Sequence, residues 1–128
     1  MSIFRDIKWF IQRGKRGYAN CDYWNFFDYL TDIIIAGLKD LKQHQFGCSS
    51  ELYDKNRKDN ECWKWEELLQ EMIDGFEASK ILNRPYFWKE TKGGQTLEKI
   101  DWKKNKLLTK KFQRGMELFS KYYLNLWD

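Results

Sequence analysis

The chain has 128 residues and a mass of 15.7 kDa, the size of one domain that buries a core without disulfides or metal. Charged residues make up 33% and the mean hydropathy is −0.80, yet 42% of the residues are hydrophobic and 18% are aromatic, which excludes a disordered tail. The longest aliphatic run, residues 33–36, is far too short to cross a membrane. We therefore predict a single domain over residues 1–128, in the cytoplasm and without a membrane partner, with its three widely spaced cysteines as free thiols.

Two helices are predicted in the first third of the chain. The first covers about residues 3–12, between Ser2 as N-cap and Gly14 beyond its end. The second follows Asp22, a good N-cap residue, and runs to about residue 43. Their apolar faces are expected to be buried: Ile3, Ile7, Phe10 and Ile11 in the first helix, and Tyr23, Phe26, Phe27, Leu30, Ile34, Leu38 and Leu41 in the second.

Two more helices are predicted after a polar loop at residues 48–60. One runs from about residue 60 to the residues before Pro85, and Thr96 is the N-cap candidate of the other, about residues 97–126. Their expected core residues are Trp65, Leu68, Leu69, Met72, Ile73 and Phe76 in the third helix, and Leu97, Ile100, Leu107, Leu108, Phe112, Phe119, Tyr122 and Leu126 in the fourth. The predicted fold class is all-α, an irregular four-helix bundle with a long C-terminal helix.

Charge is unevenly distributed along the chain. Residues 61–82 hold two basic and six acidic side chains, whereas residues 83–114 hold ten basic and three acidic ones. The helical period aligns six cations opposite the apolar face of the last helix: Lys99, Lys103, Lys106, Lys110, Arg114 and Lys121. This stripe is a solvated surface, or it pairs with the acidic helix of a neighbouring subunit in a homo-oligomer, or it binds an anionic ligand.

Aromatic rings and a basic turn extend the candidate ligand-binding set. The turn after the first helix carries Arg13, Lys15, Arg16 and Tyr18, whose guanidinium groups, together with glycine-exposed amides, suit a phosphate. It matches no P-loop or dinucleotide motif. Trp102 precedes Lys103 and offers a ring that could stack on a base. Trp9, Trp63 and Trp88 also fall outside the predicted apolar faces, and they either fold back into the core or form a contact surface.

The sequence contains few residues of the types that carry out nucleophilic or metal-dependent catalysis. His44 is the sole histidine, and no Cys-x-x-Cys pair or nucleophile elbow is present. The segments Glu71-Met72-Ile73-Asp74 and Glu98-Lys99-Ile100-Asp101 resemble the acidic motifs of all-helical nucleotide pyrophosphohydrolases, the MazG and dimeric dUTPase group. That resemblance implies Mg²⁺ bound between helices by four carboxylates, Glu71, Asp74, Glu98 and Asp101.

Two observations weigh against the enzyme. Asp74 stands where that family usually has glutamate, and helical spacing puts Glu71 and Asp74 away from the apolar face. We therefore expect no catalytic residue, no metal and no cofactor, with Mg²⁺-dependent nucleotide hydrolysis as an alternative.

Three further segments resemble a family of small helical proteins that tailed phages often encode and whose function is generally unassigned. They are Arg16-Gly17-Tyr18 with Asp22 and Trp24, residues 65–77 beginning Trp65-Glu66-Glu67-Leu68-Leu69, and residues 118–128. The resemblance implies a phage accessory role in the bacterial host cytosol, such as disarming host defence by blocking a host protein or sequestering a nucleotide signal.

These observations predict a non-enzymatic counter-defence binding protein. Its basic, aromatic-flanked surface captures an anionic small molecule such as a nucleotide, or blocks a host defence protein; nucleic-acid binding is an alternative. The predicted ligand-binding residues are Arg13, Lys15, Arg16, Tyr18, Trp102, Lys103, Lys106, Lys110 and Arg114.

Overall fold

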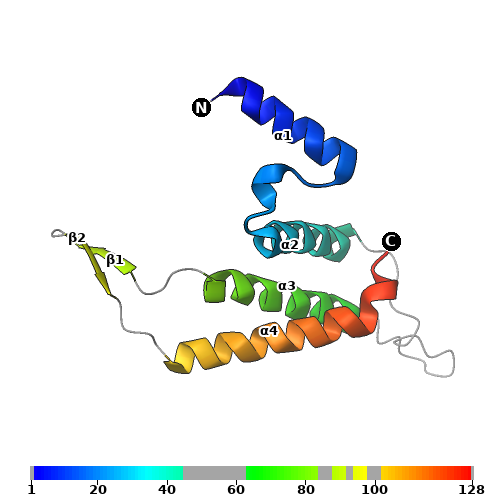
Figure 1. Cartoon of the computed structure of the whole chain (residues 1–128). Helices are drawn as coiled ribbons and strands as arrows, with labels where there is room; N and C mark the ends of the chain where they lie inside the picture. The colour runs from blue at the N-terminus through cyan, green and yellow to red at the C-terminus, as the bar shows by residue number, and fades with distance from the viewer. Residues whose placement is uncertain (1, 45–62, 84–87, 92–93, 98–101, 128) are drawn as a thin grey trace. The chain divides into compact units, whose positions relative to one another are not determined.

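The fold is seen in a computed structural model that describes residues 2–44, 63–83, 88–91, 94–97 and 102–127 (Figure 1). The all-α class is confirmed. The described residues form four α-helices, α1 (Ile3–Arg16), α2 (Phe26–His44), α3 (Trp63–Asn83) and α4 (Trp102–Tyr122). Short 3-10 turns at η1 (Asn20–Asp22) and η3 (Tyr123–Asn125) complete the helical elements. None of the helices in these ranges has the continuous apolar stretch that crossing a membrane requires.

The chain divides into two compact units, residues 1–33 and 34–128, and each is described by itself. Unit 1 contains α1, η1 and the start of α2. The predicted end of the first helix at about residue 12, before Gly14, is wrong, because α1 continues to Arg16 and stops at Gly17. Gly17 has φ of 87°, a conformation that favours glycine, and its N–H donates to the carbonyl oxygen of Arg13 at 2.8 Å.

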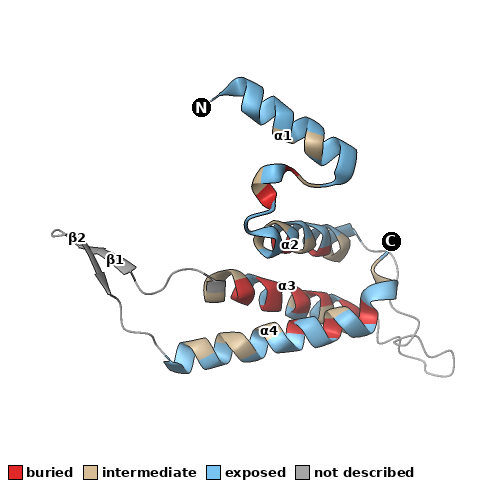
Figure 2. Cartoon of the chain, viewed as in Figure 1, coloured by how far each residue is buried: buried red, intermediate tan, exposed pale blue. Residues whose placement is uncertain are grey.

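Unit 2 is built around α3, whose apolar side is the most buried among the described residues (Figure 2). Leu69, Met72 and Ile73 are almost completely buried, and Trp65 and Phe76 are nearly so. They pack with Ile35 and Leu38 of α2 and with Leu118 and Tyr122 of α4. The predicted core side of the third helix is therefore confirmed.

Helices α3 and α4 lie antiparallel and side by side (Figure 1). The ring of Trp65, early in α3, meets Tyr122 at the end of α4 edge-on, with centroids 5.4 Å apart. Phe76, later in α3, contacts Phe119 in the same way at 5.2 Å. Such edge-to-face aromatic pairs add to the apolar burial that holds the two helices together.

Two glycines let the backbones of α3 and α4 meet. A Cβ built on Gly75 would lie 2.7 Å from the carbonyl oxygen of Lys111 and 2.8 Å from the Cα of Gly115. A Cβ on Gly115 would lie 2.9 Å from the Cα of Gly75. Since real side chains do not approach so closely, any larger residue at either position must push the helices apart.

A two-stranded antiparallel hairpin follows α3. Strand β1 (Trp88–Thr91) pairs with β2 (Gly94–Leu97), with Trp88 opposite Leu97 and Thr91 opposite Gly94. The prediction of Thr96 as a helix N-cap and of Leu97 as a core residue of the last helix is therefore wrong. Helix α4 starts at Trp102 instead and has 21 residues, as many as α3. Ile100 lies outside the described residues.

Several predicted core residues are exposed. In α1, Ile3, Ile7, Phe10 and Ile11 all reach solvent, and the helix has no buried residue. In the second predicted helix, Tyr23, Phe26, Phe27 and Leu30 are exposed, whereas Leu38 is buried and Ile34 and Leu41 pack against the core. In α4, Leu107 is exposed, and Leu118, which the spacing did not select, is buried. An amphipathic face shows which side of a helix can be buried, but not whether a partner covers it.

Candidate functional site

The predicted binding residues belong to both units. Arg13, Lys15, Arg16 and Tyr18 lie at the end of α1 and in the following turn of unit 1, whereas Trp102, Lys103, Lys106, Lys110 and Arg114 lie on α4 in unit 2.

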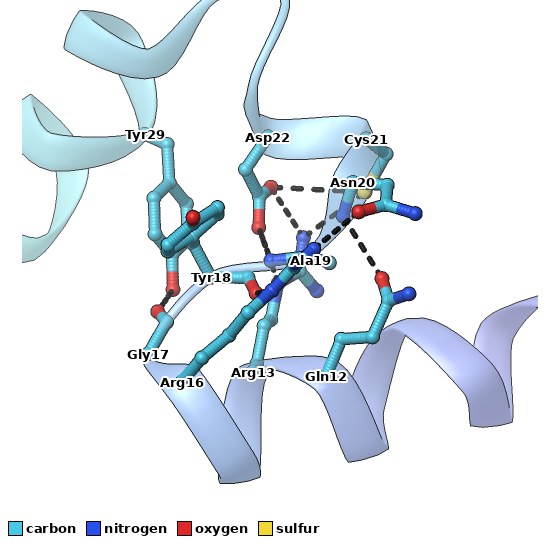
Figure 3. Close-up of polar contacts among 10 residues, drawn as sticks. All are labelled: Gln12, Arg13, Arg16, Gly17, Tyr18, Ala19, Asn20, Cys21, Asp22 and Tyr29. Carbon is cyan, nitrogen blue, oxygen red and sulfur yellow. Dashed lines mark hydrogen bonds and ion pairs between the residues drawn. The ribbon is translucent and has the colours of Figure 1, made fainter.

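The turn of unit 1 is built around a buried carboxylate, that of Asp22 (Figure 3). Arg13 donates to it from Nε to Oδ2 at 2.9 Å and from Nη2 to Oδ1 at 2.7 Å. The N–H of Ala19 donates to Oδ2 at 2.8 Å. These hydrogen bonds stabilise the charged form, so that Arg13 holds the pKa of Asp22 at about 2, well below its usual value. The same hydrogen bond raises the pKa of Arg13.

Arg16 and Tyr18 are also engaged locally. Nε of Arg16 donates to the carbonyl oxygen of Tyr18 at 2.9 Å, and its Nη2 donates to Oδ1 of Asn20. The guanidinium carbon lies 4.5 Å from the centroid of the Tyr18 ring, and that ring contacts Phe26 edge-on at 5.6 Å. Lys15 is exposed. The carboxylate of Asp22 thus accepts the Arg13 hydrogen bonds that the sequence suggested for a phosphate.

Asp22 is the residue of this turn that sequence reasoning assigned wrongly. It was expected to cap the second helix, but it belongs to η1, and α2 starts four residues later at Phe26. Its buried position could not be recognised, because a lone aspartate before an apolar helix has the pattern of an N-cap.

The first half of α4 is different, because its cations are exposed. Residues 102–114 contain six basic side chains and no acidic one. Lys103, Lys106 and Lys110 are exposed and have no charged or hydrogen-bonding partner among the described residues. Trp102 beside them is 71% exposed and Leu107 is 62% exposed. The described part of the predicted row thus lies on one helix with exposed apolar groups beside it, and Lys99 lies outside the described residues.

At the end of this row, Arg114 is paired with an acid. Its Nε donates to Oε2 of Glu71 on α3 at 3.3 Å, and both side chains are about half exposed. Exposed pairs of this kind are screened by water and contribute little to stability. Glu117 and Lys121 follow farther along α4, both exposed. The cations of this row without a partner among the described residues are thus Lys103, Lys106 and Lys110, and Arg114 is partly neutralised.

A shallow depression lies on the second half of α4. Its volume is about 750 Å³, and its described lining consists of Phe112, Gln113, Met116, Glu117, Ser120 and Lys121. This lining contains one cation and one carboxylate, and the exposed lysines of the first half of α4 lie outside it. The described lining of the depression therefore lacks the cluster of positive groups that would hold the phosphates of a compact nucleotide.

The carboxylates of the enzyme alternative are only partly described. Glu71 is paired with Arg114, and Asp74 accepts a hydrogen bond from Nε2 of Gln70 at 2.8 Å. Both are exposed, as helical spacing predicted. Glu98 and Asp101 lie outside the described residues. Within the described ranges, no group of three or more metal-ligating side chains comes together.

The tryptophans differ in how far they are exposed. Trp9 is partly buried beneath Arg5, whose guanidinium carbon lies 4.8 Å from the ring centroid. Only the backbones of Trp63 and Trp88 are described. Trp24 and Trp127, which sequence reasoning did not select, are 94% and 74% exposed.

Comparison with known proteins adds no assignment: no family model, no curated protein and no solved structure matches this chain.

Proposed function

We propose that this chain is a non-enzymatic binding protein that captures an anionic ligand on the first half of α4. The observation that carries this proposal is the exposed set of Lys103, Lys106 and Lys110, which have no partner among the described residues. Exposed lysines that pair with no acid in the described part of the chain leave a positive potential for an external anion.

The arrangement favours an extended anion over a compact one. From Lys103 to Arg114 the helix rises about 16 Å, a length spanned by roughly five phosphates of one strand of a DNA duplex. Trp102 and Leu107 add exposed apolar surface along the same stretch, where an unpaired base could stack. The form of the proposal that we favour is therefore the binding of single-stranded nucleic acid.

The narrower expectations stay proposals. Sequestration of a nucleotide signal, obstruction of a host defence protein and a phage accessory role in the bacterial cytosol all use the same exposed cations. A nucleotide would raise the melting temperature of the protein, whereas an extended strand would bind with a strong dependence on salt.

The test compares two double variants on one helix. Lys103→Gln with Lys110→Gln removes two cations of the exposed row, whereas Lys104→Gln with Lys111→Gln removes two cations at the same spacing but about 100° around the helix. Fluorescence anisotropy with labelled single-stranded DNA, measured over a series of salt concentrations, gives the affinity and its salt slope for each protein.

We expect the first double variant to bind more weakly and to reduce the salt slope by about 1.4, because two phosphate contacts are lost and each contributes about 0.7 with a single strand. The second double variant should keep a slope close to that of the unmodified protein. Equal effects of the two variants would mean that net charge, and not this face of α4, determines binding. The nucleotide form would be supported instead if cyclic oligonucleotides or ADP-ribose derivatives raised the melting temperature of the unmodified protein but not that of the first double variant. In that case single strands would bind to neither protein.

A further inference from the structure

Helix α1 is strongly amphipathic, and its apolar side has no described partner. At about 100° per residue, Ile3, Phe4, Ile7, Phe10 and Ile11 fall within an arc of about 120°. Phe4 is 84% exposed and Phe10 is 77% exposed. Large apolar side chains gathered on one exposed helix face mark an interaction surface.

The contacts that anchor α1 in unit 1 come from its polar side (Figure 3). Gln12 accepts the N–H of Asn20 on Oε1 at 2.9 Å, and Arg13 and Arg16 bond to Asp22 and to the turn. Most surface helices pack through the apolar face, and α1 does the reverse. Polar contacts therefore hold the helix in place within unit 1, and its apolar face has no partner among the described residues of that unit.

The charge of α1 indicates what covers that face. The helix contains five basic residues, Arg5, Lys8, Arg13, Lys15 and Arg16, and one acidic residue, Asp6. Lys8 and Lys15 border one edge of the apolar arc, and both are exposed. A second copy of the chain would bring the same cations against these, whereas an anionic surface would be attracted to them.

We propose that α1 is an interfacial membrane helix that lies in the surface of an anionic lipid bilayer. Its apolar side chains enter the acyl boundary, and Lys8 and Lys15 contact the headgroups. A strong polar and basic face, bulky apolar residues opposite it and low overall hydrophobicity are typical of such helices. With 14 residues, α1 is about 21 Å long, which is too short to span a bilayer but sufficient to lie along one. Tyr23 and Trp24, residue types enriched at membrane interfaces, are also exposed in unit 1.

The experiment is co-sedimentation of the full chain with vesicles of phosphatidylcholine alone or with about 30% phosphatidylglycerol. We expect binding to the anionic vesicles. Phe4→Gln with Phe10→Gln leaves the charge unchanged and should weaken binding by about tenfold or more, because two large apolar groups no longer enter the bilayer. The matched control is Met116→Gln with Leu124→Gln, which changes two exposed apolar residues of unit 2 and should bind vesicles like the unmodified protein.

A second pair of measurements separates α1 from the basic face of α4. Replacing Lys8 and Lys15 with glutamine should weaken vesicle binding by about fivefold for each lysine. The Lys103→Gln, Lys110→Gln variant should still bind anionic vesicles. Adding Phe4→Gln and Phe10→Gln to that variant should weaken its vesicle binding as much as in the unmodified protein.

Three results would overturn this proposal. The first is no binding to anionic vesicles, and the second is equal binding by the Phe4→Gln, Phe10→Gln variant. The third is a fall in mass from dimer to monomer in that variant, measured by light scattering, because a second copy would then cover α1. None of these results bears on single-strand binding by α4, so the two proposals can fail separately.

Discussion

Arg13 and Asp22, nine residues apart, form a two-point ion pair that closes the turn after α1, with Nη2 and Oδ1 2.7 Å apart. The side chain of Asp22 is 8% exposed and that of Arg13 is 44% exposed. One carboxylate thus joins the end of the helix to the 3-10 turn and also receives the N–H of Ala19.

This pair predicts acid sensitivity in unit 1. The pKa of Asp22 is about 2 in the folded chain and close to its ordinary value of 3.8 when unfolded. Because the folded pKa is the lower one, the stabilising contribution is fully present above about pH 4 and is lost as the pH falls toward 2. Hydrogen exchange should show protection of the Ala19 amide at neutral pH and its loss over this range.

Two variants check the cause of that loss. Asp22→Asn should already expose the Ala19 amide at pH 7 and show a weaker dependence on pH between 4 and 2. Asp6→Asn in the first turn of α1 changes the charge equally without touching the pair. An Ala19 amide that stays protected in Asp22→Asn would show that the carboxylate does not hold the turn.

Alanine at the glycine crossing should loosen unit 2. Gly75→Ala or Gly115→Ala places a methyl group within 3 Å of backbone atoms of the facing helix, and we expect a loss of about 1–3 kcal/mol in the free energy of unfolding. Gly37→Ala in α2 is the matched control, because no described atom lies within 4 Å of its added methyl group. That control should gain up to about 1 kcal/mol from helix propensity. Urea denaturation followed by circular dichroism measures all three, and a stabilised Gly75→Ala would contradict the close crossing.

Glu71→Gln distinguishes a binding protein from a hydrolase. Removing this carboxylate frees Arg114 and takes away one negative charge beside the exposed lysines, so the affinity for single-stranded DNA should rise a few-fold. Stability should change by less than about 1 kcal/mol, because the pair is exposed.

The enzyme alternative predicts that the same variant loses an activity. Pyrophosphate release in the presence of Mg²⁺ would be present in the unmodified protein and would disappear in Glu71→Gln. Detection of that activity, with its loss on substitution, would replace the binding proposal.

Helical periodicity predicted the buried side correctly for α3, which packs against both α2 and α4. The core side of α3 is confirmed from Trp65 to Phe76, because a helix between two neighbours buries its whole apolar face. The same periodicity was wrong for Ile3 and Phe10, since the pattern in α1 is equally strong although both side chains are exposed.

The close contacts were harder to predict. Gly75 and Gly115 each lie inside a helix, where glycine is unfavourable, and that cost could have pointed to a packing role. Which glycine faces which depends on the crossing of two helices and cannot be read from either segment. Spacing predicted that Lys103, Lys106 and Lys110 share one side of the last helix, but the pairing of Arg114 with Glu71 depends on the same crossing.

The burial of Met72 has a consequence for oxidation chemistry. Its thioether is completely enclosed between the helices of unit 2, whereas Met116 on the outside of α4 is 43% exposed. Peroxide should therefore convert Met116 to the sulfoxide in the folded protein and reach Met72 only when the helices separate. The ratio of the two sulfoxides, read by mass spectrometry, would report how often unit 2 opens.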